Sequence, residues 1–287
     1  MAYNEEDDIH FASLNVWQTL RFALTHKMPK RDKHRLPIVV NALLRMFGIS
    51  HTAYTLVGDA YLRGISGGER KRVSISESLA GNATVLCWDN STRGLDASTA
   101  LDYAKSLRVM TDVSNRTTLV TLYQTGEDIY NLMDKVMVLH EARMIYQGPA
   151  NEAKQYFIDL GFRCPERQTT ADFLTAVTNP IEQKFQPGME ARAPKSAEEL
   201  EAAFRNSKAY RKVLEDVEDY KTYLQRTKLA DAEKFKLSVQ QAKSKTVSKD
   251  SSYTVSFLRN LRACVQREFW LLWGDKPALY TKLYAAP

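Results

Sequence analysis

The first 150 residues alternate short apolar runs with segments whose apolar residues recur at helical spacing. TVLCW at 84–88 and TTLVTL at 117–122 are short and rich in β-branched residues, which is typical of buried strands. Between them, the segment from Asp96 to about Met110 has the spacing of a helix and begins with residues that cap helices well. Strands that are separated by crossover helices predict an α/β fold with a largely parallel sheet.

Further elements flank this pattern on both sides. DKVMVLH at 134–140 and RMIYQ at 143–147 look like a strand pair, which we expect the Gly148-Pro149 turn to close. The earlier segment 16–47 looks all-helical, and Pro29 and Pro37 should break it into pieces.

From Ala150 onward the apolar spacing is helical. A helix that stops at Gly161 and a short one near 170–177 are expected, after which 184–196 (KFQPGMEARAPKS) has the composition of an exposed linker. Residues 197–241 predict one or two helices, whose charges indicate a solvated face.

The segment 255–273 is amphipathic. The apolar residues that share one side of a helical wheel are Phe257, Leu258, Leu261, Cys264, Val265 and Leu272, and the polar residues of the other side are Arg259, Arg262, Gln266 and Arg267. Its Trp and Arg content favours a helix that lies in a membrane interface.

Composition narrows the class of protein. With 287 residues, 44% of them hydrophobic, the chain can bury a core. The net charge of +6 comes from interleaved acids and bases, which favours a solvated or membrane-facing surface over nucleic-acid binding. Three scattered cysteines exclude a disulfide framework or a zinc cluster, and no apolar run approaches the roughly 20 residues of a membrane span. The acidic start differs from a signal peptide, so the chain reads as soluble or peripheral.

The strongest local signal is GISGGERKRVSISESLAG at 64–81. Ser66 and Glu69 form a capping box that predicts a helix start, and Gly81 is placed to end the helix. Gly67 and Gly68 leave backbone N–H groups open at the positive end of the helix dipole, which suits a phosphate. The alternative is an ordinary capped helix whose glycines serve packing.

The order of motifs decides between these alternatives. SGGER, a strand that ends in Asp89, the triplet GLD and a second strand follow one another as in an ATP-binding-cassette (ABC) domain. The chain resembles that superfamily, and more narrowly the first nucleotide-binding domain of fungal pleiotropic-drug-resistance exporters. The segments that carry the resemblance are YNEEDDIHF (3–11), GISGGERKRVSI (64–75), CWDNSTRGLDAST (87–99), TLYQ (121–124), IYQGP (145–149) and RQTTADFLT (167–175).

The resemblance implies roles for particular residues. The residues that match the signature sequence, which in this family contacts the γ-phosphate of ATP held by the partner domain, are Ser66, Gly67, Gly68 and Glu69. Asp96 matches the loop that crosses the dimer interface. Asp89 matches the acid that organises Mg²⁺, although a helix cap at the strand end is the plain alternative.

Three positions depart from the family pattern. Asn90 stands where the family usually has the glutamate that activates water, and an amide cannot accept a proton at neutral pH. Tyr123 stands where a histidine senses the γ-phosphate, and phenol replaces imidazole poorly. Glu6 aligns with a glutamine that couples nucleotide to the membrane domain, or is simply one more solvated acid.

Other catalytic constellations are weak. No glycine is followed by lysine, so the phosphate loop G-x-x-x-x-G-K-[ST] is not in this sequence; in the family it precedes residues 3–11. The five histidines show no ligand spacing, and Ser74, Ser76 and Ser78 have no evident His or Asp partner.

The resemblance therefore implies a P-loop-NTPase-like α/β domain, incomplete because it lacks the phosphate-loop part, over residues 1–180. A linker and charged helices over 181–250 and an interfacial helix over 251–287, ahead of a missing transmembrane domain, would follow. Such a chain binds ATP and Mg²⁺ jointly with a second nucleotide-binding domain, at the cytoplasmic face of a membrane, by family resemblance the plasma membrane, in a multidrug exporter whose transmembrane domains carry the substrate. We expect its own hydrolytic site to be degenerate and the chain alone to be inactive.

Two other functions stay open. The chain is a non-catalytic soluble binding or regulatory module, or an inert fragment, if its reading frame leads to no membrane spans. A soluble cassette ATPase that acts on ribosomes or DNA fits poorly, because the helix at 255–273 suits a membrane surface better than nucleic acid.

Overall fold

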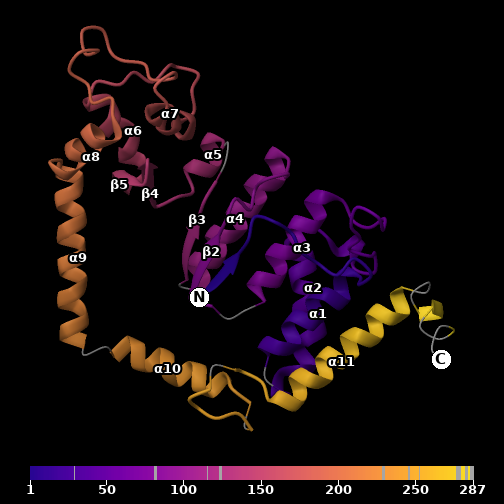
Figure 1. The fold of residues 1–287 in the computed structure, drawn as a ribbon. Coiled ribbons are helices and arrows are strands. Elements are labelled where there is room, and N and C mark those ends of the chain that lie inside the picture. The colour runs from indigo at the N-terminus through magenta and orange to yellow at the C-terminus, as the bar shows by residue number, and fades with distance from the viewer. Residues whose placement is uncertain are drawn as a thin grey trace. The chain divides into compact units, whose positions relative to one another are not determined.

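The computed structural model describes residues 1–28, 30–80, 83–114, 116–122, 125–227, 230–244, 246–251, 253–275, 279–281 and 284 (Figure 1). The chain divides into two compact units: Met1–Tyr123 together with Ala232–Pro287, and Gln124–Asp231.

The first unit is an α/β layer with a helical part. Its elements are β1 (Ala2–Asn4), α1 (Val16–Lys27), the 3-10 helices η1 (Lys30–Arg35) and η2 (Ser50–Thr52), α2 (Leu36–Met46), α3 (Gly67–Leu79), β2 (Val85–Trp88), α4 (Ala97–Ser114), β3 (Thr117–Val120), most of α10 (Ala230–Ala242) and α11 (Phe257–Gly274). The strands and the α4 helix that were expected from the sequence are confirmed.

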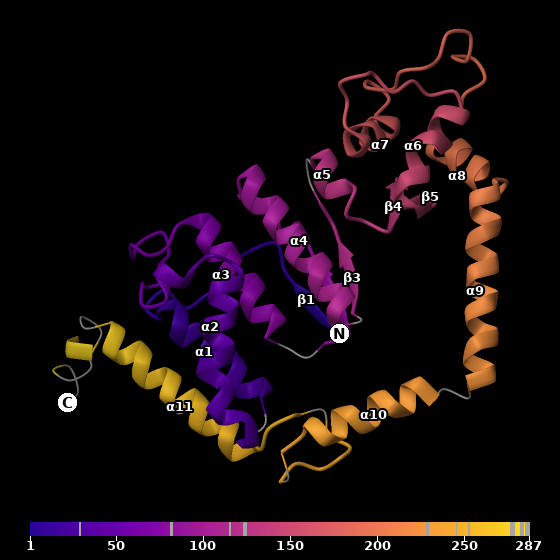
Figure 2. The ribbon, with the colours of Figure 1, turned by 180° about the vertical axis from the view of Figure 1, so that it is seen from behind.

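A parallel sheet of order β1-β2-β3 organises this unit. Leu86 of β2 is in register with Ala2 of β1 on one side and with Thr118 of β3 on the other. Helix α4 makes the crossover between β2 and β3, and it runs beside the strands in both views (Figures 1 and 2). Because all three strands are parallel, the residues that follow them meet at the same edge of the sheet.

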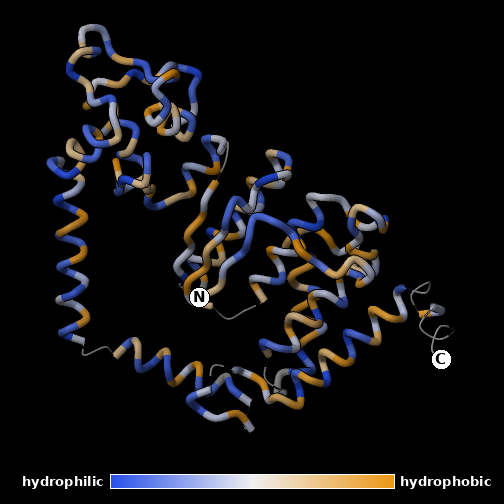
Figure 3. The backbone as a smooth tube through the Cα atoms, in the orientation of Figure 1, coloured by the Kyte–Doolittle hydropathy of each residue, from blue (hydrophilic) through white to orange (hydrophobic). Residues whose placement is uncertain are grey.

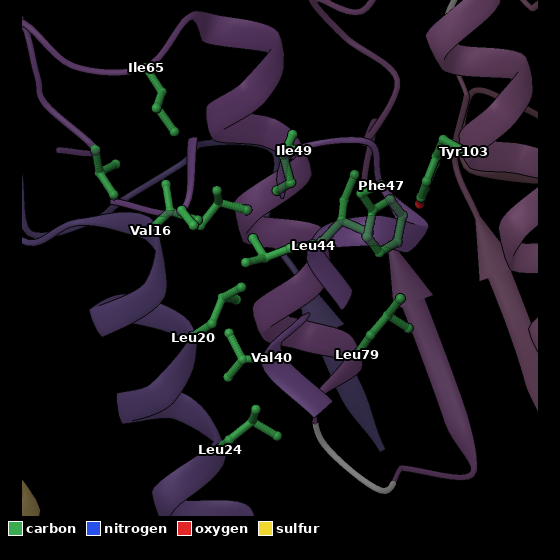
Figure 4. Close-up of a cluster of buried hydrophobic side chains, with 14 of the residues drawn as sticks. Val16, Leu20, Leu24, Val40, Leu44, Phe47, Ile49, Ile65, Leu79 and Tyr103 are labelled. Carbon is green, nitrogen blue, oxygen red and sulfur yellow. The ribbon is translucent and has the colours of Figure 1, made fainter. Parts of the chain in front are cut away.

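The core of the first unit lies between α1, α2, α3 and the sheet. Leu20 on α1, Leu44 on α2 and Ile75 on α3 are at most 1% exposed (Figure 4 shows the first two and their neighbours). Burying one such side chain stabilises the fold by about 1.5–3 kcal/mol. The expected division of 16–47 into helical pieces is confirmed, and Pro37 lies in the first turn of α2, where its missing N–H costs nothing. Pro29 lies outside the described residues.

The second unit is built around a β-hairpin and several short helices. Its elements are α5 (Glu127–Tyr130), β4 (Lys135–His140), β5 (Arg143–Pro149), α6 (Ala150–Asp159), α7 (Thr170–Thr178), α8 (Ala197–Arg205) and α9 (Lys208–Thr227). The expected helices near 150–161 and 170–177 are confirmed, and Gly161 follows the first of them with φ of 101°.

The expected turn of the hairpin was wrong. Gly148 and Pro149 lie within β5 and pair with Val136 and Lys135, whereas the turn is Glu141-Ala142. Both turn residues have positive φ, 48° and 61°, which a tight hairpin requires and which glycine or asparagine usually supplies. The sequence therefore gave no signal for a turn at this position.

The expected exposed linker at 184–196 was also wrong. Phe185 packs against the core of the second unit, which contains Phe157 and Phe162, and Ala193 is buried. The Gln186 side chain donates hydrogen bonds to backbone carbonyls, 2.7 Å to that of Ile158. The segment is therefore a packed part of this unit.

Helix α11 packs on α1 with a mixed side that includes Arg267, whereas Arg262 and Gln266 of the expected polar side are exposed. The Arg267 guanidinium lies 4.8 Å from the ring centroid of Phe11 and 5.0 Å from that of Phe22, which are cation–π distances. A Cβ on Gly274 would lie 2.7 Å from the Ser13 carbonyl oxygen, so the backbones approach closely there.

Large apolar residues of α11 are also exposed, and Figure 3 shows apolar and polar residues alternating along this helix. Its exposed large residues are Phe257, Leu258, Leu261, Val265, Phe269 and Trp273. Across the described ranges, every helix is too short or too polar to cross a bilayer.

Candidate functional site

Asp89 follows β2 at the edge of the sheet where the three strands end. The Thr121 hydroxyl donates to its Oδ1 at 2.7 Å, and the Tyr3 hydroxyl donates to its Oδ2 at 2.8 Å. The hydrogen bond from Thr121, and then that from Tyr3, lower the pKa of Asp89, so that the carboxylate stays charged. Asp89 thus caps no helix; one hydroxyl from β1 and one from the residue after β3 hold it in place.

Asn90 adopts the left-handed backbone region with φ of 43°. Its N–H donates to the Thr121 hydroxyl at 2.9 Å, and its side-chain Nδ2 donates to Glu6 Oε1 at 3.0 Å. The remaining side-chain oxygen, Oδ1, is buried and has no hydrogen-bond partner. Position 90 therefore keeps one buried acceptor without a hydrogen-bond partner.

Glu6 is brought to Asn90 although 84 residues separate them. The Arg93 guanidinium also donates to Glu6 Oε1. This hydrogen bond, followed by that from Asn90, lowers the pKa of Glu6. Sequence reasoning singled out Glu6, Asp89 and Asn90 but missed Tyr3 and Arg93, since neither belongs to a recognisable spacing.

The segment that carries Glu6 is fixed to α3. Lys71 is buried, and its Nζ donates to the Glu6 carbonyl at 2.6 Å and lies 3.5 Å from Asp8 Oδ1. His10 Nε2 lies 2.7 Å from the Ser74 hydroxyl. The expectation that Ser74 has no His partner is therefore wrong, but both residues are buried, and the pair joins two segments rather than facing solvent.

The N-terminus of α3 has the geometry that its sequence predicts. The Ser66 side chain accepts from the Glu69 N–H at 3.3 Å, and the Glu69 carboxylate accepts from the Ser66 N–H at 2.8 Å. His51 also contacts the Glu69 carboxylate at 2.9 Å. A Cβ on Gly67 would meet no atom within 4 Å, so the first turn of α3 is open to a ligand.

Gly68 of α3 lies close to the loop before α4, and Asp96 belongs to that loop. A Cβ on Gly68 would lie 3.9 Å from the Gly94 carbonyl oxygen. Asp96 accepts hydrogen bonds from the hydroxyls of Ser98, at 2.6 Å, and Thr99, at 2.7 Å, which lower its pKa. Asp96 therefore caps α4 within this chain. Tyr123 and Gly81 lie outside the described residues.

Comparisons with known proteins show the family of this chain. A family model described as ABC transporter matches residues 1–93, and one described as ABC-2 type transporter matches residues 123–271, about half of the chain. The chain belongs to the ABC transporter family. The second match extends over the second unit, α10 and most of α11, so a model of the family's membrane part matches the helical extension.

Fungal transporters are among the relatives of this ABC protein. It is 65% identical over 282 residues to the ABC multidrug transporter atrF of Aspergillus flavus, covering 98% of this chain and 18% of that protein. It is 46% identical over 283 residues to the ABC multidrug transporter SNQ2 of Candida glabrata, covering 96% of this chain and 19% of that protein. The ABC transporter G family member 14 of Dictyostelium discoideum is 46% identical over 289 residues, with 98% and 20% covered. The chain thus spans about a fifth of the length of these curated relatives.

ABC proteins bind ATP, normally with Mg²⁺, and the residues at the sheet edge fit part of such a site. Where the structure describes the chain, it holds no cluster of three or more His, Cys, Asp or Glu that could enclose a metal ion. Mg²⁺ commonly takes only one or two carboxylates and completes its shell with water and phosphate. The Asp89 carboxylate can supply a protein oxygen of that kind.

Proposed function

We propose that this chain supplies the signature helix to an ATP site that it shares with a second nucleotide-binding domain. The observation that carries the proposal is the open first turn of α3: a Cβ on Gly67 would meet nothing, while Ser66 and Glu69 hold the turn in shape. An N-terminal turn of this kind presents backbone N–H groups to an anion. The residues that contact the partner's nucleotide in this proposal are Ser66, Gly67, Gly68 and Glu69. Asp96 lies at the interface between the two domains.

In this proposal, the chain's own sheet edge binds ATP but does not hydrolyse it. Asp89 is the acid placed to hold Mg²⁺, and Asn90 has an acceptor but no group that takes up a proton at neutral pH. Tyr123 at the position of the sensing histidine would weaken the same half further. ATP hydrolysis would then be confined to the half whose base lies on the partner.

The setting follows from the relatives, whose names describe multidrug transporters. We assign residues 1–180 to part of a nucleotide-binding domain, 181–250 to a packed segment followed by charged helices, and 251–287 to an interfacial helix. The exposed apolar side of α11 supports contact with the cytoplasmic face of a membrane, by family resemblance the plasma membrane. The whole transporter would export drugs or other xenobiotics.

ATP turnover by the purified chain tests the claim about its own half. We expect no Mg²⁺-dependent ATP hydrolysis above the level of Asp89→Ala. Asp102→Ala is the matched control, because it removes an exposed acid from α4. Turnover that Asp89→Ala abolishes and Asp102→Ala preserves would contradict the proposal.

A further inference from the structure

The contact between Glu6 and Asn90 restricts what position 90 can carry. Glu6 Oε1 accepts hydrogen bonds from Asn90 Nδ2, at 3.0 Å, and from the Arg93 guanidinium. If the amide were reversed, its oxygen would face the carboxylate and the hydrogen bond would be lost. Glu6 therefore sets the orientation of the amide and leaves Asn90 Oδ1 as the unused, buried acceptor.

The backbone adds a second restriction at the same position. Asn90 has φ of 43°, a conformation that asparagine adopts more readily than longer side chains do. The short Asn90 side chain thus suits the positive φ, and its neutral donor group suits the neighbouring Glu6 carboxylate. Arg93 balances one carboxylate in this cluster, and that carboxylate is Glu6.

We propose that Glu6 and Asn90 are a matched acid–amide pair, in which Glu6 prevents position 90 from carrying a carboxylate. A glutamate at position 90 would place a second negative charge next to Glu6, and neighbouring carboxylates disfavour each other's ionised form. The family resemblance implies glutamine at position 6 and glutamate at position 90. This chain instead has the acid at position 6 and the amide at position 90. Restoring a general base would require changing both positions together.

This inference deepens the proposed function and rests on it for its meaning in hydrolysis, but the pair itself can be tested without nucleotide. The comparison uses Asn90→Gln and Asn90→Glu, each with Glu6 and with Glu6→Gln. Gln and Glu have the same size and the same difficulty with positive φ, so the cost of the backbone conformation cancels between them. The thermal midpoint Tm of the purified chain is measured at pH 7.5 and low salt.

With Glu6 present, we expect Asn90→Glu to unfold about 1–3 °C below Asn90→Gln. With Glu6→Gln, the difference should become clearly smaller, because the charge of Glu6 is gone while that of the neighbouring Asp89 remains. Glu5→Gln is the matched control, because it removes an adjacent exposed acid and should leave the difference intact. No difference with Glu6 present, or an equal difference after Glu6→Gln, would overturn the pair.

The outcome separates this inference from the proposed function. The Tm comparison contains no ATP, so it fails only if the acid–amide pair is wrong. ATP turnover by the unsubstituted chain would contradict the proposed function and would leave the Tm comparison unaffected.

Discussion

Lys71 offers the sharpest test of how the chain positions Glu6. Its side chain is only 3% exposed, and its Nζ contacts the carbonyls of Glu6, at 2.6 Å, and Glu5, at 3.5 Å, as well as the Asp8 carboxylate. A hydrogen bond from a charged donor contributes about 1.5–3 kcal/mol, and a partly exposed ion pair adds less than about 1 kcal/mol. Lys71→Met keeps the apolar stem and removes these contacts.

We therefore expect Lys71→Met to lower the free energy of unfolding by about 2 kcal/mol, since burying a thioether instead of an ammonium offsets part of the loss. Urea denaturation followed by circular dichroism measures the change. Lys105→Met on α4 is the matched control, because Lys105 is exposed, and it should change stability by less than about 0.5 kcal/mol. Equal effects of the two substitutions would refute the view that Lys71 fixes residues 5–8 to α3.

Three further predictions concern other parts of the first unit. Leu44→Ala should cost about 3 kcal/mol in urea denaturation because Leu44 is 1% exposed in the core, whereas Met46→Ala, at 42% exposure, should cost far less. Burial lowers the pKa of His10, so below about pH 6.5 the unfolded chain binds a proton that the folded chain does not. The free energy of unfolding should therefore fall as the pH is lowered from 7.5 to 5.5, and it should fall less in His10→Gln. Phe269→Glu on the exposed side of α11 should weaken binding to anionic lipid vesicles at least about tenfold in a flotation assay. Tyr54→Glu, which also replaces an exposed aromatic residue, should leave binding unchanged. Equal binding by both variants would show that α11 does not contact the membrane.

The sequence predicts those parts of the fold that short-range patterns determine. The capping box of Ser66 and Glu69 is a four-residue signal, and it is present in the structure as expected. Strand β1 escaped notice because three residues carry no periodicity. The turn at Glu141-Ala142 escaped because neither residue favours positive φ, and pairing of the two strands imposes it.

The residues of the site could be predicted from the sequence, but the contacts between them could not. Motif spacing singled out Asp89, Asn90 and Glu6, but their joining depends on the parallel pairing of β1 with β2. Arg267 likewise looked like a solvent-facing charge, because a helical wheel does not show the rings of Phe11 and Phe22 beneath it. Contacts between distant segments are set by packing, and packing overrides local pattern.

In our proposal, the contribution of this chain to ATP hydrolysis is its signature helix rather than its own sheet edge. It is tested most directly in the full-length Aspergillus flavus transporter, 65% identical over 282 residues, with this chain's sequence grafted over the matching segment. A Cβ would meet no atom within 4 Å at position 67 or at position 126, so we expect Gly67→Val and its control Gly126→Val to fold alike. We predict that Gly67→Val lowers Mg²⁺-ATPase activity at least about tenfold, the scale of losing one well-placed contact to the transition state, while Gly126→Val and Asn90→Ala leave it within about twofold. Full activity of Gly67→Val, or loss of activity in Asn90→Ala alone, would contradict the account.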